Sequence, residues 1–107
     1  MDISLKPVTK ANYEAVCDLD VAEFQQDFVA CNMWSLVEAQ FNEGYVTRAI
    51  YQADSAVGFF MWVKETPSKI SIWRFMVDEK FQKHGIGRIA LKLALAEIKT
   101  DTAIREI

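Results

Sequence analysis

Two glycines stand directly before an apolar helix pattern in the stretch FQKHGIGRIALKLALAEIK, which runs from Phe81 to Lys99. The first N–H groups of a helix have no intrahelical partner, and the helix dipole leaves partial positive charge there. Gly85 and Gly87 lack the Cβ atoms that would keep an anion away from those N–H groups. The side chains around them add donors and positive charge: Gln82, Lys83, His84 and Arg88. The stretch therefore predicts a site that binds a phosphate.

A tight strand-to-helix connection is the alternative explanation for the two glycines, because glycine serves tight turns in general. The spacing matches neither GxxxxGK(S/T) nor GxGxxG, which argues against nucleotide sites of the usual kinds. The order of the elements favours the phosphate site. A strand pattern over Ile70–Val77, a short acidic turn, the glycines and a long helix follow one another along the chain.

The composition sets limits on partners and location. The chain has 107 residues, of which 51% are hydrophobic and 25% charged, and this predicts a single soluble domain over residues 1–107. The net charge of -3 argues against nucleic-acid binding, so a bound anion must be held by local geometry. The apolar runs are shorter than the roughly 18 residues needed to span a bilayer, and the N-terminus lacks a signal-peptide pattern. We therefore expect a cytoplasmic protein that binds no membrane.

The two cysteines, Cys17 and Cys31, form no CxxC spacing and lie in helix-like surroundings. We therefore expect reduced, mostly buried thiols and neither a disulfide framework nor a metal site. A thiol nucleophile paired with His84 is disfavoured, because core cysteines are common and His84 already has a place beside the glycines.

The hydrophobic pattern changes its period at Gly44 and separates a helical part from a strand part. The helical part opens with a strand over Ile3–Val8 and continues with a helix over about residues 10–19, for which Thr9 is the expected N-cap. A short second helix follows. A third helix is expected to start in a Ser-x-x-Glu capping box at Ser35.

The strand part begins with a hairpin, in which YVTRAIYQ and AVGFFMWVK are the strands and Ala53-Asp54-Ser55 the turn. The run Phe59–Val63 does not alternate, which indicates a strand buried on both faces. A strand over Ile70–Val77, a long helix from about Ile86 and a short final strand within Thr102–Ile107 complete a mixed α/β fold.

The glycine stretch resembles the acetyl-CoA-binding motif Q/R-x-x-G-x-G/A of the GNAT N-acetyltransferase superfamily, written here Gln82-Lys83-His84-Gly85-Ile86-Gly87. The preceding RFMVDEKF, Arg74 to Phe81, resembles the strand and acidic turn that lead into that motif. A further segment is similar to the one after the first helix in bacterial spermidine/spermine acetyltransferase-like members: Gln26, Asp27, Phe28, Val29, Asn32, Ser35, Leu36 and Ala39. The resemblance covers nearly the whole chain.

The resemblance implies a GNAT-like α/β (α+β) fold, a mainly antiparallel sheet with helices on both faces, and acetyl-CoA as co-substrate. It implies that the pyrophosphate lies on backbone N–H groups from Lys83 to Arg88. The pantetheine arm would pair with the backbone of a strand, and an N–H near Met76 would stabilise the oxyanion. The implied cofactor-binding residues are Phe75, Met76, Val77, Gln82, Lys83, His84, Gly85, Ile86, Gly87 and Arg88.

The sequence departs from the family pattern at two places. Trp73, followed by Arg74, stands where polyamine-acetylating relatives often carry an acidic residue, and both are expected to be ordinary strand residues, with Trp73 packed. The chain stops at Ile107, where the family's fifth strand would begin, so the later helix, the last strands and the tyrosine general acid are expected to be missing. The catalytic residues therefore stay unassigned, apart from the backbone near Met76.

Two hypotheses of different classes follow. The first is an acetyl-CoA-dependent N-acetyltransferase that acts on a small amine, with a polyamine as a candidate. The second is a truncated, inactive GNAT-like domain that binds CoA or oligomerises.

The partners of the domain can also be anticipated from the sequence. Acidic residues between the first helices could attract a cationic amine, although such charges are usually a helix's solvated face: Asp18, Asp20, Glu23 and Asp27. Trp, Phe and Met side chains on strands without C-terminal cover predict a homodimer or a larger homo-oligomer.

Overall fold

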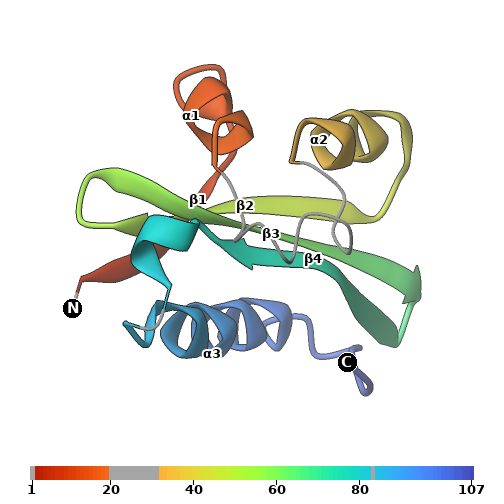
Figure 1. The fold of residues 1–107 in the computed structure, drawn as a ribbon. Helices are drawn as coiled ribbons and strands as arrows, with labels where there is room; N and C mark the ends of the chain where they lie inside the picture. Colours follow the sequence, from red (N-terminus) through yellow and green to blue (C-terminus); the bar gives the residue numbers. More distant parts are fainter. Residues whose placement is uncertain (1, 20–31, 83) are drawn as a thin grey trace.

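The computed structural model describes residues 2–19, 32–82 and 84–107. One antiparallel sheet has the strand order β1-β2-β3-β4, formed by β1 (Ile3–Pro7), β2 (Tyr45–Gln52), β3 (Ser55–Thr66) and β4 (Lys69–Val77). Helices α1 (Tyr13–Cys17) and α2 (Asn32–Phe41) cover one face of the sheet, and α3 (Ile86–Ile98) covers the other (Figure 1). A short 3-10 helix, η2 (Glu79–Phe81), joins β4 to α3. The predicted mixed fold with helices on both faces is confirmed.

Strand β3 lies in the middle of the core and is buried on both faces, as its unbroken apolar run predicts. Phe60 and Trp62 pack in the cluster beneath α3, whereas Phe59 and Met61 pack in the cluster beneath α1 and α2. Both clusters are built on alternate residues of one strand, because successive side chains of a strand point to opposite faces. This strand therefore holds the two helical layers together.

The turn between β2 and β3 is shorter than the sequence suggests, because Ser55 already belongs to β3. Ala53 has a φ of 51°, a left-handed conformation that L residues rarely adopt. A two-residue hairpin loop needs such a positive φ, which glycine and asparagine supply more readily. Ala53 is therefore a strained position in an otherwise regular hairpin.

Replacing Ala53 with glycine should stabilise the protein by about 0.5–1 kcal/mol, because glycine adopts a positive φ without steric cost. Urea unfolding would measure the change. Ala56→Gly is the matched control, since Ala56 lies within β3 and glycine weakens a strand interior. Equal destabilisation by the two variants would show that Ala53 carries no strain.

A β-bulge in β4 changes which side chains face α2. Met61 pairs with Arg74 and Trp62 pairs with Ile72, so Trp73 is an extra residue in β4. Before the bulge, Ile72 packs on the α3 side; after it, Arg74 reaches Glu38 on α2. An inserted residue moves the side chains that follow it to the opposite face of the sheet. This bulge therefore places Arg74 on the face that α2 covers.

The predicted packing role of Trp73 agrees with its contact to Tyr45. Their rings meet edge to face with centroids 5.4 Å apart, although Trp73 stays 39% exposed.

The prediction for the first helix is wrong in its bounds and its cap. Thr9 to Asn12 form a turn instead, in which Thr9 Oγ1 accepts from the Ala11 N–H at 3.2 Å and Asn12 Oδ1 accepts from the Thr9 N–H at 2.8 Å. Such local side-chain bonds compete with helix formation, so α1 begins only at Tyr13. The predicted second helix falls in residues 20–31, outside the described residues.

The capping box at Ser35 is also a wrong prediction, because α2 begins at Asn32 and Ser35 lies inside it, fully buried. The sequence predicts a short strand within Thr102–Ile107. In the described residues this segment contributes only a parallel bridge between Glu106 and Lys69, with the Ile70 N–H donating to the Glu106 carbonyl oxygen at 2.9 Å. Among the described helices, none is long and apolar enough to cross a bilayer.

Candidate functional site

The connection from β4 to α3 is held in shape by two polar side chains. Asp78 caps η2, with its Oδ1 accepting from the Lys80 N–H at 3.0 Å. Gln82 reaches back along the chain, and its Nε2 donates to the Val77 carbonyl oxygen at 2.9 Å. The residue predicted to open the phosphate loop therefore also ties that loop to the end of β4.

Gly85 is the N-cap of α3 and has a φ of 79°, in the left-handed region where glycine is favoured. No side-chain hydrogen bond caps α3 at this N-cap, in the part of the loop that the structure describes. The N–H groups of the first helical turn are thus left for an outside acceptor, and the helix dipole favours a negative one. This start of α3 fits a phosphate group.

Gly87 has a packing role as well. A Cβ built on Gly87 would lie 3.4 Å from Phe75 Cζ and 3.8 Å from Val77 Cγ2, so the start of α3 rests closely on β4. Phe75 in turn stacks on Phe60, with ring centroids 4.5 Å apart. The strand and the helix start that were predicted to share one cofactor are therefore in direct contact.

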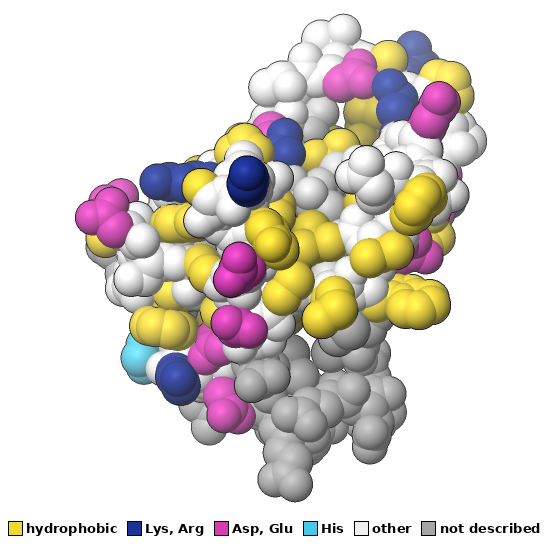
Figure 2. Space-filling view, turned by 90° about the horizontal axis from the view of Figure 1, so that it is seen from above, with side chains coloured by type: hydrophobic (Ala, Val, Ile, Leu, Met, Phe, Trp, Pro, Cys, Tyr) yellow, Lys and Arg dark blue, Asp and Glu magenta, His cyan; other side chains and the backbone are white. Residues whose placement is uncertain are grey.

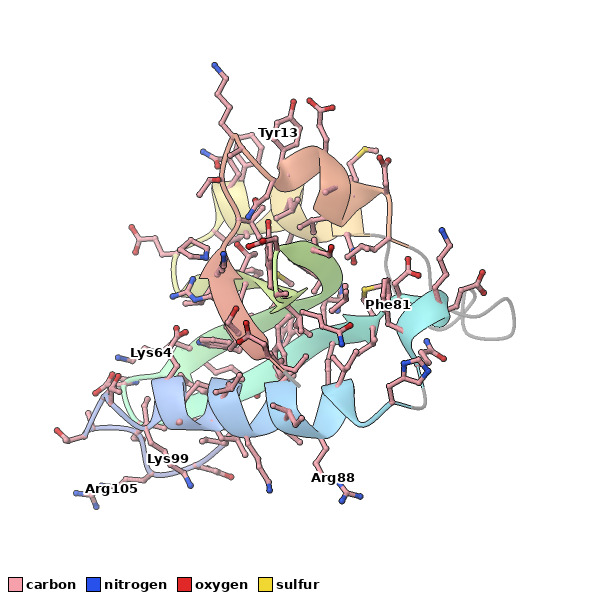
Figure 3. The ribbon with its side chains drawn as sticks, turned by 90° about the vertical axis from the view of Figure 1, so that its left-hand side faces the viewer. Tyr13, Lys64, Phe81, Arg88, Lys99 and Arg105 are labelled. Carbon is pink, nitrogen blue, oxygen red and sulfur yellow. The ribbon has the colours of Figure 1, made fainter. Side chains whose placement is uncertain are left out.

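The other residues of the predicted site lie in different surroundings. Ile86 is 1% exposed and anchors α3 in the core, so only its backbone could meet a ligand. His84 and Arg88 are exposed, and Arg88 projects from α3 away from the sheet (Figure 3). Lys83 lies outside the described residues.

Strand β4 is the last strand of the described sheet, with β3 on one edge. On its other edge, Glu106 pairs with Lys69 at the start of the strand. Backbone groups of a strand alternate between its two edges. The Asp78 N–H donates to the Val57 carbonyl oxygen at 2.7 Å, and the Met76 carbonyl oxygen lies 2.5 Å from a Cβ built on Gly58, so both face β3. By alternation, Phe75 and Val77 direct their backbone groups to the outer edge, where the Val77 carbonyl oxygen accepts from Gln82 Nε2.

Sequence reasoning missed a polar contact between α2 and β4. Arg74 Nη2 lies 3.6 Å from Glu38 Oε1, and Ser35 is one helical turn from Glu38. The signal in the sequence is the spacing of Asn32, Ser35 and Glu38, which puts three polar residues on one side of the helix. The acids Asp20, Glu23 and Asp27 lie outside the described residues.

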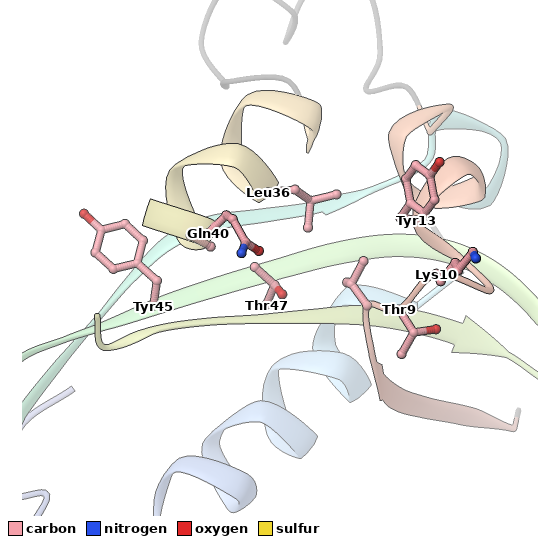
Figure 4. Close-up of a pocket in the computed structure, with 9 residues that line it drawn as sticks. Thr9, Lys10, Tyr13, Leu36, Gln40, Tyr45 and Thr47 are labelled. Carbon is pink, nitrogen blue, oxygen red and sulfur yellow. The ribbon is translucent and has the colours of Figure 1, made fainter. Parts of the chain in front are cut away.

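Two hollows lie on the α1 and α2 side of the sheet. One is lined by Tyr13, Leu36, Gln40, Tyr45 and Thr47 among others, so that hydroxyl and amide groups lie beside apolar side chains (Figure 4). The other lies between the two helices and brings Glu14 and Asp18 beside Met33 and Val37. Of the acids that the sequence suggested for an amine, the structure thus places Asp18 at a hollow. Among the described residues, no cluster of His, Cys, Asp and Glu could hold a metal ion.

Comparison with known proteins gives the class of the domain. Residues 13–107 match the acetyltransferase (GNAT) family, and the chain belongs to that family. It is 29% identical to a spermine/spermidine N(1)-acetyltransferase of Bacillus subtilis strain 168, over 92% of this chain and 69% of the relative. It is 28% identical to a probable spermine N(1)-acetyltransferase of Bacillus subtilis subsp. natto over the same shares.

Solved structures of the family share the fold. A GNAT acetyltransferase of Elizabethkingia anophelis with acetyl-CoA bound aligns with a TM-score of 0.63 at 19% identity, over 94% of this chain. The chain spans 60% of the length of that protein. The PaiA N-acetyltransferase of Thermoplasma acidophilum in complex with coenzyme A aligns with a TM-score of 0.69 at 12% identity, over 96% of this chain and 76% of its own.

Proposed function

We propose that this domain binds acetyl-CoA and transfers its acetyl group to the nitrogen of a small amine. The observation that carries the proposal is the start of α3 at Gly85, which has no side-chain cap and lies against β4, the last strand of the described sheet. A polyamine is the first acceptor to test, because the curated relatives are named for spermine and spermidine. The cytoplasmic location expected from the sequence stays a prediction.

Acetyl-CoA would contact two parts of the domain, the start of α3 and the outer edge of β4. Backbone N–H groups from His84 to Arg88 would hold the pyrophosphate. The helix dipole and the direction of these N–H groups attract the anion, although the protein carries a net negative charge. The backbone groups of Phe75 and the N–H of Val77 would hold the pantetheine arm as a neighbouring strand would. When bound, acetyl-CoA supplies a thioester whose acetyl carbon is open to attack by an amine.

The chain's own contribution to the reaction is to stabilise negative charge on the acetyl oxygen and to orient the amine. The oxyanion donor that the sequence places near Met76 is best assigned to the N–H of Phe75. That N–H points to the outer edge of β4, whereas the backbone of Met76 faces β3.

An acetyl-transfer assay tests the proposal. The protein should release CoA thiol from acetyl-CoA when spermidine is added, and mass spectrometry should find acetylated spermidine in equal amount. Coenzyme A binding without turnover for spermidine or for glycinamide would instead support the inactive binding domain. Absence of both binding and turnover would contradict the two hypotheses together.

Self-association is expected through the outer face of α2. Its apolar residues are strongly exposed, at 61% for Met33, 65% for Trp34, 52% for Val37 and 81% for Phe41. Figure 2 shows apolar side chains gathered on the side of the molecule that carries α1 and α2. An exposed apolar stripe of this kind favours burial against a second copy of the chain.

Light scattering should therefore find a homodimer or a larger homo-oligomer, and Phe41→Asp should weaken the association by at least about tenfold. Glu43→Gln is the matched control, since Glu43 is an exposed residue just after α2. A monomer of the unchanged protein over a wide concentration range would refute this expectation.

A further inference from the structure

We propose that a polar seam between α2 and β4, formed by Ser35, Glu38 and Arg74, receives the amino group of the acceptor. In this seam Glu38 accepts a hydrogen bond from the amine, and Arg74 positions the Glu38 carboxylate. The inference rests on the proposed function, because it names the residues that bind the second substrate of the same reaction.

The first support is that buried polar atoms without partners gather in this seam. Ser35 Oγ, Glu38 Oε1 and Arg74 Nε are the buried side-chain nitrogen and oxygen atoms of the described residues that make no hydrogen bond. Arg74 Nη2 approaches Glu38 Oε1 to 3.6 Å, which is an ion pair and not a hydrogen bond. Buried polar atoms in proteins nearly always have a hydrogen-bond partner. Three buried atoms without one in the same seam therefore indicate that a polar ligand binds there.

The second support is that the most buried residues of α2 are polar. Asn32 is 6% and Ser35 0% exposed, whereas the apolar Leu36 and Ala39 are only partly buried against the core. A helix on a sheet usually buries its apolar stripe. A polar inner face reduces stability, and a role in binding explains why the polar residues stand there.

The third support is the position of the seam along β4. The bulge at Trp73 turns Arg74 toward α2, and Met76 follows two residues later on the same face. One helical turn before Ser35, Asn32 contacts Met76 Sδ at 3.6 Å with its Nδ2, so the seam continues to Met76. Two residues of a strand cover about 7 Å. An amine held by Glu38 is therefore near the backbone that is proposed to hold the thioester.

The chemistry of the seam suits an amine. A primary amine offers N–H donors, and Glu38 Oε1 and Ser35 Oγ are acceptors with nothing bonded to them. The Arg74 and Glu38 side chains are 25% and 26% exposed, whereas the three atoms without partners are buried, so an amine must enter between the two side chains. Arg74 holds the carboxylate by charge, without a hydrogen bond to its Oε1.

Calorimetry on protein saturated with CoA tests the proposal, with spermidine and glycinamide as the two amine probes. Glu38→Gln should weaken binding of the recognised amine by at least about tenfold, because the acceptor of the hydrogen bond loses its negative charge. Its affinity for CoA should stay unchanged. The control Glu43→Gln, which makes the same charge change at an exposed position after α2, should alter neither affinity. In turnover, Glu38→Gln should raise the KM for the amine while leaving the KM for acetyl-CoA unchanged.

The variant Ser35→Ala shows whether Ser35 serves amine binding or the stability of the fold. Removing a fully buried hydroxyl that has no partner should raise the midpoint of thermal unfolding, yet weaken amine binding severalfold. The double variant with Glu38→Gln and Arg74→Met should bind the amine no worse than Glu38→Gln alone, since Arg74 acts through Glu38.

The outcomes are distinguishable. A Glu38→Gln variant that binds CoA and an amine as well as the unchanged protein does would overturn the seam and leave the proposed function in place. Unchanged protein that binds CoA but neither probe amine would also overturn the seam. Amine binding that depends on Glu38 in a protein without CoA affinity would support the seam and refute the proposed function.

Discussion

Coenzyme A binding should fall by at least about tenfold when Gly85 is replaced by alanine. A tenfold loss corresponds to about 1.4 kcal/mol, which is no more than one charge-assisted hydrogen bond to a phosphate is worth. Gly85 has a φ of 79°, so an L residue there strains the turn that presents the first N–H groups of α3. The methyl group also stands where the pyrophosphate is proposed to approach. Isothermal calorimetry with CoA measures the loss.

Gly44→Ala is the matched control for this experiment. Gly44 has a nearly equal φ of 81°, but it lies in a hollow with Ile98 and Asp101, at the far end of α3. Gly44→Ala should lose stability through its strained φ and through a Cβ contact of 3.2 Å with the Lys64 carbonyl oxygen, yet only Gly85→Ala should lose CoA affinity. Lys83→Ala should cost about 1 kcal/mol or less, because it removes one charge and leaves the backbone N–H groups in place.

Pantetheine, which lacks the pyrophosphate, provides a second control. Its affinity should be the same for Gly85→Ala and for the unchanged protein, because its contacts are proposed to lie on β4. Unchanged protein that gives no heat with CoA at high micromolar concentration would contradict the site. So would a folded Gly85→Ala variant that binds CoA as well as the unchanged protein.

A valine at Gly87 is less informative, although the sequence alone makes it an attractive test. A Cβ at this position already meets Phe75 Cζ at 3.4 Å, so the larger side chain would disturb the packing of α3 on β4. A loss of binding would then have two causes. Gly85 is therefore the better position at which to test CoA binding by substitution.

Much of the fold could be predicted from the sequence because its main signal is hydrophobic periodicity. The change of period at Gly44 separates helices from strands, and the unbroken run Phe59–Val63 indicates a strand buried on both faces. The glycine pair locates the start of α3. These features depend on a few neighbouring residues, so a single sequence contains them.

The features that could not be predicted depend on contacts between distant segments. Thr9 and Ser35 are good capping residues in isolation, but Thr9 closes a turn and Ser35 packs inside α2. The bulge at Trp73 is invisible in the apolar pattern, yet it decides that Arg74 faces Glu38. The candidate amine site follows from that pairing, and only the three-dimensional structure brings the two residues together.

Gly58 is the position where a single methyl group should damage the fold most. It lies in β3, and a Cβ built on it would be 2.5 Å from the Met76 carbonyl oxygen and 2.9 Å from Ile50 Cδ1. The first contact is with backbone, which cannot turn away as a side chain can. A glycine inside a strand often marks such a close approach of another backbone.

Gly58→Ala should therefore destabilise the protein by about 3 kcal/mol, the upper part of the usual range for overpacking a core. Urea unfolding should show an earlier midpoint, and Ser55→Ala, an exposed change at the start of the same strand, should leave it nearly unmoved. Because β4 must shift to make room, binding of CoA and of pantetheine should both weaken, unlike in Gly85→Ala. A Gly58→Ala variant as stable as the unchanged protein would mean that β3 and β4 lie further apart than the structure places them.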